Sequence, residues 1–184
     1  CGFAPEKEGK WTGALLPSAA FAEYRALAEG AAFSPMLGWG ETYLGAVTGN
    51  NKYFTLTRDR VRELRIPQGD LLPISPPGSR HLRGMTFTEP AWSQAANDGS
   101  ACHLFYPASR LSVAATRYIE QGEAAEVHRA YKCQVRDPWW RVPVVPVPDL
   151  LLTYMDQHRP RLITNAAKVA HLNSLYGVTL RANL

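Results

Sequence analysis

The sequence has little cysteine, and its cysteines lie too far apart to form a framework. They number three, Cys1, Cys102 and Cys133, and no two are spaced as a CxxC pair. Disulfide scaffolds and structural zinc sites need cysteines in closely spaced sets. The spacing therefore excludes both classes and fits a reducing cytosol. We expect a cytoplasmic protein in which Cys102 and Cys133 are inert buried thiols.

Long apolar runs are also missing. No stretch of the sequence is apolar for the length that a bilayer requires, and the first residues do not resemble a signal segment. Hydrophobic residues make up 46% of the chain and charged residues 20%, which is ordinary for a globular protein. We therefore expect no membrane partner.

Self-contained catalytic motifs are absent as well. The five histidines show no metal-binding spacing with the cysteines, and the sequence has neither a GxSxG elbow nor a Walker loop. Ser75-Pro76-Pro77-Gly78 resembles the Asn/Asp/Ser-Pro-Pro-aromatic motif of amino-methyltransferases, but Gly78 replaces the aromatic ring that stacks on the target base. We expect no catalytic residue, metal or cofactor in this chain.

Positive charge is present in modest excess and is unevenly distributed. The net charge is +4 and the pI is about 9.1, which permits a polyanionic partner without requiring one. The segment Lys52–Arg65 holds five cations against Asp59 and Glu63. At 184 residues the chain is long enough for one domain with a real core.

The stretch Tyr131–Asp149 combines cations, tryptophans and prolines at positions 138, 143, 146 and 148. Proline fixes φ, lacks an N–H and pushes its predecessor toward extended geometry. We therefore expect no helix here, but a short strand at Tyr131–Val135 that leads into a stiff extended segment. Rigid tryptophans among cations suit nucleic acid, because cations meet phosphates or guanine edges and flat rings meet bases. The alternative is that Trp139, Trp140 or both are core anchors.

Hydrophobic periodicity in the first half predicts two helices and a hairpin. A helix begins near Pro17, with Ser18 as its cap, and ends near Gly30. Strands at Thr42–Val47 and Tyr53–Thr57 would form a hairpin around a polar turn. The second helix covers Thr57–Leu64 and is capped by Thr57.

The second half predicts several more short elements and a polar loop at Ser93–Ser100. A helix is expected at Leu111–Gln121, where apolar residues recur at helical spacing. The expected strands are Met85–Thr88, Cys102–Tyr106, Arg161–Thr164 and Tyr176–Leu180, with Leu150–Met155 as a strand or a short helix. These elements predict an α+β fold, with a loop-rich mixed or antiparallel sheet and a few short helices.

Two loops offer polar side chains to a polyanion. The turn after Val47 carries asparagines, which can pair bidentately with adenine, and Lys52, which can reach a phosphate. The alternative is that Asn50 and Asn51 merely make the turn. Arg80 and Arg83 flank His81 in the loop-rich segment Leu71–Gly84 and could contact phosphates.

Four segments of the sequence together resemble one known family. They are VTGNNKYFTLT at Val47–Thr57, CHLFYP at Cys102–Pro107, the run Tyr118–Leu152 that contains YKCQVRDPWWRVP, and PRLITNAAKVAHLNSLYGVTL at Pro160–Leu180. In this order they resemble the carboxy-terminal target-recognition region of class I adenine-N6 DNA methyltransferases. These are the Eco57I/TaqI-like modification methylases of restriction–modification systems, and the resemblance covers nearly the whole chain.

The resemblance implies a division of labour. Such enzymes pair an S-adenosylmethionine-binding catalytic domain with a recognition domain across a cleft that holds duplex DNA, and the target adenine flips out of the helix. This chain has neither the catalytic loop nor the cofactor strand. The resemblance therefore implies a domain that selects double-stranded DNA and methylates nothing alone. We expect residues 1–13 to be a lead-in and residues 14–184 to be a fragment of a longer methyltransferase.

The resemblance and the loops together give a set of residues expected to contact DNA. They are Thr48, Asn50, Asn51, Lys52, Arg80, Arg83, Lys132, Arg136, Trp139, Trp140, Arg141, Asn165, Lys168 and Asn173. Residues shared by enzymes of different specificity are expected to hold the fold or to grip phosphates. Base readers are expected in other loops, among them Leu71–Arg83 and Asp98–Ala101.

A second function stays open on sequence alone. The proline and valine strap after Trp140 could bind a peptide or a partner subunit, which would make the chain a protein-interaction module. Salt distinguishes the two hypotheses, because phosphate contacts weaken steeply with ionic strength whereas an apolar interface is nearly indifferent to it.

Overall fold

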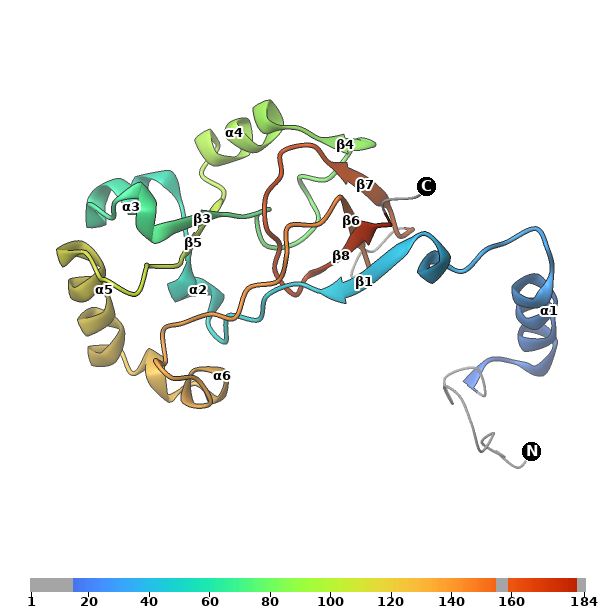
Figure 1. The fold of residues 1–184 in the computed structure, drawn as a ribbon, viewed down its shortest axis with the longest axis horizontal. Coiled ribbons are helices and arrows are strands. Elements are labelled where there is room, and N and C mark those ends of the chain that lie inside the picture. Colours follow the sequence, from blue (N-terminus) through green and yellow to red (C-terminus); the bar gives the residue numbers. More distant parts are fainter. Residues whose placement is uncertain (1–14, 155–158, 182–184) are drawn as a thin grey trace. The chain divides into compact units, whose positions relative to one another are not determined.

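The computed structural model of the chain describes residues 15–154 and 159–181 (Figure 1). It divides into two compact units, residues 1–40 and 41–184. The lead-in predicted for residues 1–13 lies outside the described residues. Helices and short strands are mixed in the second unit, which confirms the α+β class.

The described part of the first unit contains α1 (Ser18–Glu29) and the 3-10 helix η2 (Met36–Gly38). The predicted helix is confirmed, with Gly30 at its C-cap, and none of its twelve residues is buried. The predicted cap by Ser18 is wrong. Pro17 is the N-cap residue, with extended geometry (φ −53°, ψ 140°), so Ser18 already lies inside the helix and no side chain caps it.

The larger sheet of the second unit is mixed, as predicted. Its strand order is β1-β8-β6-β7-β4, and β6 pairs antiparallel with both β7 and β8, whereas β4 pairs parallel with β7. The strands are β1 (Gly40–Leu44), β4 (Thr86–Phe87), β6 (Leu150–Thr153), β7 (Leu162–Asn165) and β8 (Leu175–Leu180). A small core at one face of this sheet contains Phe87, Leu151 and Ile163, and Trp92 packs against it.

A second, antiparallel sheet has the order β2-β5-β3. Its strands are β2 (Thr55–Leu56), β3 (Leu71–Pro73) and β5 (His103–Phe105). All three residues of β5 are buried at the centre of this sheet, and the strand predicted at Cys102–Tyr106 is confirmed. The segment after β7 joins the two sheets, because it forms isolated bridges from Ala170 to Ile74 and from Leu172 to Ala46.

The predicted hairpin around residues 48–52 is wrong. β1 belongs to the larger sheet and β2 to the smaller one, so the two strands do not pair with each other. The turn residues instead begin a short helix, α2 (Asn51–Phe54), because the side chain of Asn50 accepts the Tyr53 N–H at 3.1 Å. Asparagine favours turns and helix N-caps alike, and the sequence pattern alone does not separate them.

The predicted strand at Tyr131–Val135 is wrong as well. These residues form α6 (Tyr131–Gln134), directly after the 3-10 turn η4 (Val127–Arg129). The first proline of the stretch, Pro138, restricts itself and Asp137 but not the residues six or seven positions earlier. The prolines therefore do not exclude a helix at residues 131–134.

The polar loop predicted at Ser93–Ser100 is also wrong, since most of it lies in α4 (Glu89–Asn97). Thr88 caps this helix by accepting the Ala91 N–H, and Pro90 stands in its first turn, where the missing N–H costs nothing. The inward residues Trp92 and Ala96 are four apart, which is a helical spacing hidden among polar neighbours.

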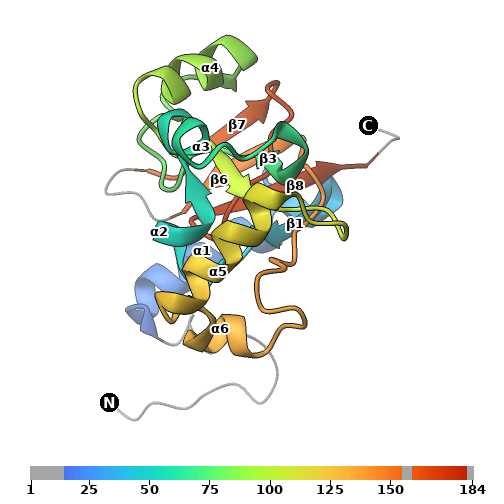
Figure 2. The ribbon, with the colours of Figure 1, turned by 90° about the vertical axis from the view of Figure 1, so that its left-hand side faces the viewer.

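The other predicted helices of the second unit are confirmed, and side chains cap both. Thr57 caps α3 (Arg58–Leu64) and Ser112 caps α5 (Val113–Ala124). A single 3-10 turn, η3 (Gln68–Asp70), lies between α3 and β3. Figures 1 and 2 show α2, α3, α5 and α6 gathered on one side of the second unit, away from the larger sheet.

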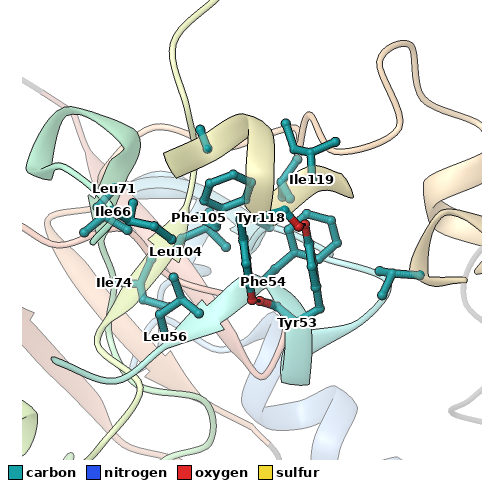
Figure 3. Packing of buried hydrophobic residues seen from close by; sticks show 14 of the residues in the cluster. Tyr53, Phe54, Leu56, Ile66, Leu71, Ile74, Leu104, Phe105, Tyr118 and Ile119 are labelled. Carbon is teal, nitrogen blue, oxygen red and sulfur yellow. Dashed lines mark hydrogen bonds between the residues drawn. The ribbon is translucent and has the colours of Figure 1, made fainter. Parts of the chain in front are cut away.

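The main core is centred on two tyrosines (Figure 3). The rings of Tyr53 from α2 and Tyr118 from α5 are stacked, with centroids 4.5 Å apart and planes 2° apart. Each hydroxyl donates to the backbone carbonyl of the other residue, at 2.9 Å from Tyr53 and 2.7 Å from Tyr118. Burial raises the pKa of Tyr118 to about 12, so both hydroxyls remain donors at neutral pH.

We expect Tyr118→Phe to lower the free energy of unfolding by about 1–3 kcal/mol. The substitution keeps the ring stack but leaves the buried carbonyl of Tyr53 without its donor. Urea unfolding at pH 7 measures the change. Tyr131→Phe is the matched control, because that ring is exposed, and it should change stability by less than about 0.5 kcal/mol.

His81 predicts a dependence of stability on pH. Its Nε2 lies 2.7 Å from Ser75 Oγ, and burial lowers its pKa to about 4. Below pH 6.5 the unfolded chain therefore takes up a proton that the folded chain refuses until about pH 4. Stability is fully present above pH 6.5 and falls toward pH 4, by at most about 1.4 kcal/mol per pH unit from this group.

We expect His81→Gln to reduce that loss. Urea unfolding of both proteins at pH 7.5 and pH 5 measures the difference between the two losses. The loss should be smaller in the variant but not zero, since burial also lowers the pKa of His103 and His171. Equal losses in the two proteins would contradict the assignment to His81.

Candidate nucleic-acid interface

Two basic segments far apart in the sequence meet in the structure. The loop Thr48–Lys52 lies against the first turn of α6, where a Cβ added to Gly49 would come within 2.8 Å of Lys132 Cβ. Gly49 also has φ +85°, which side chains rarely adopt, so the close approach depends on glycine. Lys52 and Lys132 are both exposed on the surface that results.

Arg136 holds this junction together. Its guanidinium donates to the carbonyls of Thr48, at 2.8 Å, and Val47, so both NH₂ groups are engaged by the backbone. Burial lowers the pKa of Arg136, although a guanidinium remains charged at any ordinary pH. These contacts support the expectation that a shared residue of the stretch holds the fold.

The polar side chains of the loop are partly used inside it. Thr48 is buried, and its hydroxyl accepts the Asn50 N–H and donates to Asn51 Oδ1. Asn50 caps α2, so the alternative in which asparagine shapes the turn describes Asn50 well. Asn51 and Lys52 are exposed and could reach a ligand.

The two tryptophans of the stretch make different contacts. Trp139 packs against Tyr53 and Phe54, with ring centroids 5.7 and 6.2 Å away, and its Nε1 donates to Glu123 Oε1 at 3.0 Å. It therefore anchors the core, as the alternative interpretation predicts. Trp140 also packs against the main core, and it supports a cation, because the guanidinium of Arg141 lies 5.0 Å from its ring.

Arg141 is held between two aromatic rings. Besides Trp140, its guanidinium lies 5.6 Å from the ring of Tyr106. Such cation–π contacts fix the side chain without neutralising its charge. Arg141 therefore remains available to a phosphate in a restricted orientation.

The loop with Arg80 and Arg83 is a separate basic feature. Both arginines are exposed, and Arg83 Nε donates to the Arg80 carbonyl at 2.7 Å. Gly78 N–H donates to Ser174 Oγ at 3.1 Å, which ties the loop to the segment before β8.

Most contacts of the predicted residues in the segment 165–173 are structural. Asn165 is fully buried, and its amide donates to the carbonyls of Pro148 and Val169, both at 2.9 Å, while its oxygen accepts the Val169 N–H. Lys168 is exposed but lies 3.4 Å from Asp149 Oδ1. The Asn173 backbone accepts from Tyr154 and donates to Ala46. Asn165 has no free group for a base, and we leave it out of the interface.

Sequence reasoning missed a groove of about 760 Å³ beside the junction. Asn50 and Lys52 line it together with Arg60 from α3 and Gln121 from α5. A weak signal for the groove exists in the sequence, since Lys52 and Arg60 both lie in the basic segment Lys52–Arg65.

The described residues offer no metal site and no helix that could cross a membrane. No three histidine, cysteine or acidic side chains among residues 15–154 and 159–181 are grouped closely enough to hold an ion. Within the same residues, no helix is both long and apolar enough to cross a bilayer. Cys102 and Cys133 are buried and reduced, and burial raises the pKa of Cys102 to about 11.

Comparison with known proteins gives the family. A model of the family described as Type II methyltransferase M.Eco57I, C-terminal domain, matches residues 8–184. The chain belongs to this family. The match confirms the resemblance drawn from the quoted segments, because it covers the same part of the chain.

One relative illustrates the relation to a longer protein. The Type II methyltransferase M.AccI of Acinetobacter calcoaceticus is 22% identical to the chain over 142 residues. The match covers 77% of this chain and 26% of the relative. The chain therefore spans about a quarter of the length of that methyltransferase.

We expect Arg136→Gln to lower the free energy of unfolding by about 2 kcal/mol, because two backbone carbonyls lose a charged donor. Lys132→Gln is the matched control, because Lys132 lies in α6, four residues before Arg136. Its ammonium group is exposed, so the change should stay within about 0.5 kcal/mol. Urea unfolding compares the two, and equal effects would show that Arg136 does not hold the junction.

Proposed function

We propose that this chain is the target-recognition domain of a Type II adenine-N6 DNA methyltransferase in a restriction–modification system. One observation carries the proposal beyond the family. Segments 48–52 and 131–141, which both carry the family resemblance, meet around Arg136, where Lys52 and Lys132 are exposed and Lys52 lines the basic groove. Paired cations beside a groove suit the closely spaced phosphates of duplex DNA.

The proposal divides DNA contacts into two kinds. Asn51, Lys52 and Lys132 are exposed, and Arg141 is oriented by Tyr106 and Trp140. All four suit phosphates, which position the protein without reading sequence. Arg80 lies in the separate loop that was expected to read bases. An arginine there can bind guanine bidentately in the major groove.

Methyl transfer itself is assigned to a different part of the methyltransferase. Gly78 has φ +86° and no ring to stack on a flipped base, and the hydroxyl of Ser75 is bonded to His81. These residues therefore do not fit a catalytic loop. S-adenosylmethionine would bind in a catalytic domain outside this chain, and the whole enzyme would act on DNA in the cytoplasm.

The interaction-module alternative receives less support from the packing. Trp139 lies against the aromatic core and Trp140 supports Arg141, so neither ring is left free for a peptide. The strap after them exposes Val147 but buries Val142 and Pro148. An apolar peptide would find little continuous surface there.

Binding of the 184-residue chain to a random-sequence duplex pool, titrated across salt at fixed pH, tests the proposal. We expect affinity to fall steeply with salt and the bound pool to be enriched in one short sequence. Binding without enrichment would assign the phosphate grip to this chain and the readout to the whole enzyme. No binding at low salt by a chain that is folded by circular dichroism would overturn the proposal.

The double variant Lys52→Gln/Lys132→Gln locates the contact. If each lysine meets one phosphate, the slope of log K against log salt should become shallower by about 1.8, since each contact contributes about 0.9. Enrichment of the preferred sequence should persist, because phosphate contacts carry no sequence information. An unchanged slope would move the interface away from the junction.

A further inference from the structure

A continuous furrow runs between α3 and α5. It consists of three adjoining cavities of about 350, 290 and 760 Å³. The first two share Arg65 and Arg117 in their linings, and the second and third share Tyr118 and Gln121. Figure 2 shows the two helices side by side at the front of the view.

The furrow is lined by cations along its length. Arg65 and Arg117 stand at one end, and Arg60 and Lys52 line the cavity at the other. Among the residues that the structure describes, Glu63 is the one carboxylate in these linings, and it pairs with Arg60 at 2.7 Å. Among the residues that the structure describes, neither Arg65 nor Arg117 forms an ion pair, and both side chains are exposed.

The backbone at Arg65 is unusual for an arginine. Arg65 is the C-cap of α3 and has φ 54° and ψ 34°, the left-handed region that glycine or asparagine normally occupies at a helix end. Its N–H donates to Arg62 and Val61 carbonyls, which fixes it there. A long cation at a position that favours glycine is an outlier of the kind found at binding sites.

The dimensions and the floor of the furrow suit an extended strand. Along α5 the lining extends from Val113 to the C-cap residue Ala125, which corresponds to about 18 Å at 1.5 Å per residue. The end near Arg65 has an apolar floor that includes Leu64, Pro67 and Val113. Cations above an apolar floor match a sugar–phosphate chain, which offers charged oxygens and apolar sugar faces in alternation.

We propose that this furrow binds the sugar–phosphate backbone of one DNA strand. Arg65 and Arg117 bind phosphates at one end, and the strand leads along Gln121 to Lys52 at the junction. The proposal rests on the function proposed above and extends its footprint by a set of contacts that read no bases. It gives a role to arginines that neither the sequence pattern nor the family resemblance singled out.

The test compares two double variants of the 184-residue chain that lose the same charge. R65N/R117Q removes the furrow cations, and asparagine is chosen because it tolerates the left-handed backbone of position 65. R62Q/R159Q is the matched control, since Arg62 and Arg159 are exposed and line none of the furrow cavities. Each is titrated with the random-sequence duplex at several salt concentrations.

We expect the slope of log K against log salt to become shallower by about 1.8 in R65N/R117Q and to change little in the control. R65K/R117K should restore most of the slope, because lysine keeps the charge. Urea unfolding of each variant checks that the fold is intact. If R65N/R117Q unfolds, R117Q alone is used, with an expected slope change of about 0.9 and R159Q as its control.

The outcomes separate this proposal from the function on which it rests. If the unaltered chain binds duplex but the furrow variant keeps the slope of its control, the furrow proposal falls and the recognition function stands. If the unaltered chain binds no duplex, both fall. If R65K/R117K binds as weakly as R65N/R117Q, the arginines support the fold and do not hold phosphates, which also overturns the furrow proposal.

Discussion

The stacked pair of Tyr53 and Tyr118 is the interaction on which the functional side of the molecule depends. It joins α2 to α5 by a ring stack and by two reciprocal hydrogen bonds to the backbone. Helix α2 carries Lys52, and α5 carries Arg117 and Gln121. Both rings also line the cavity of about 760 Å³. The buried contact between the two tyrosines therefore sets where Lys52 lies relative to Arg117.

Arg136 and Gly49 add a second constraint around the same place. Arg136 binds the backbone of the loop before α2, and the lack of a side chain at Gly49 lets that loop lie against α6. Gly49 and Arg136, which lie in segments that carry the family resemblance, thus hold the loop against α6. Lys52 and Lys132 are exposed beside these contacts. In the proposed function they would hold phosphates, and base readout would belong to other loops.

Local signals in the sequence predict a helix correctly where the capping residue bonds to its near neighbours in the chain. Thr57 accepts the N–H three residues on and caps α3, so that helix was predicted with its start. The same local chemistry misled at Asn50, because a turn and a helix cap look alike until the partners of the adjacent strands are known. At α6 the error came from extending the influence of Pro138 to residues that it does not touch.

The sequence by itself determined the α+β class, the family, and the presence of a basic segment and an aromatic stretch. The tertiary structure decided which of their residues face outward. Asn165 is buried with its amide fully bonded, Trp139 is a core anchor, and Arg65 and Arg117 come together across two helices. The physical reason is that composition and periodicity act over a few residues, whereas burial and the meeting of distant cations depend on long-range packing.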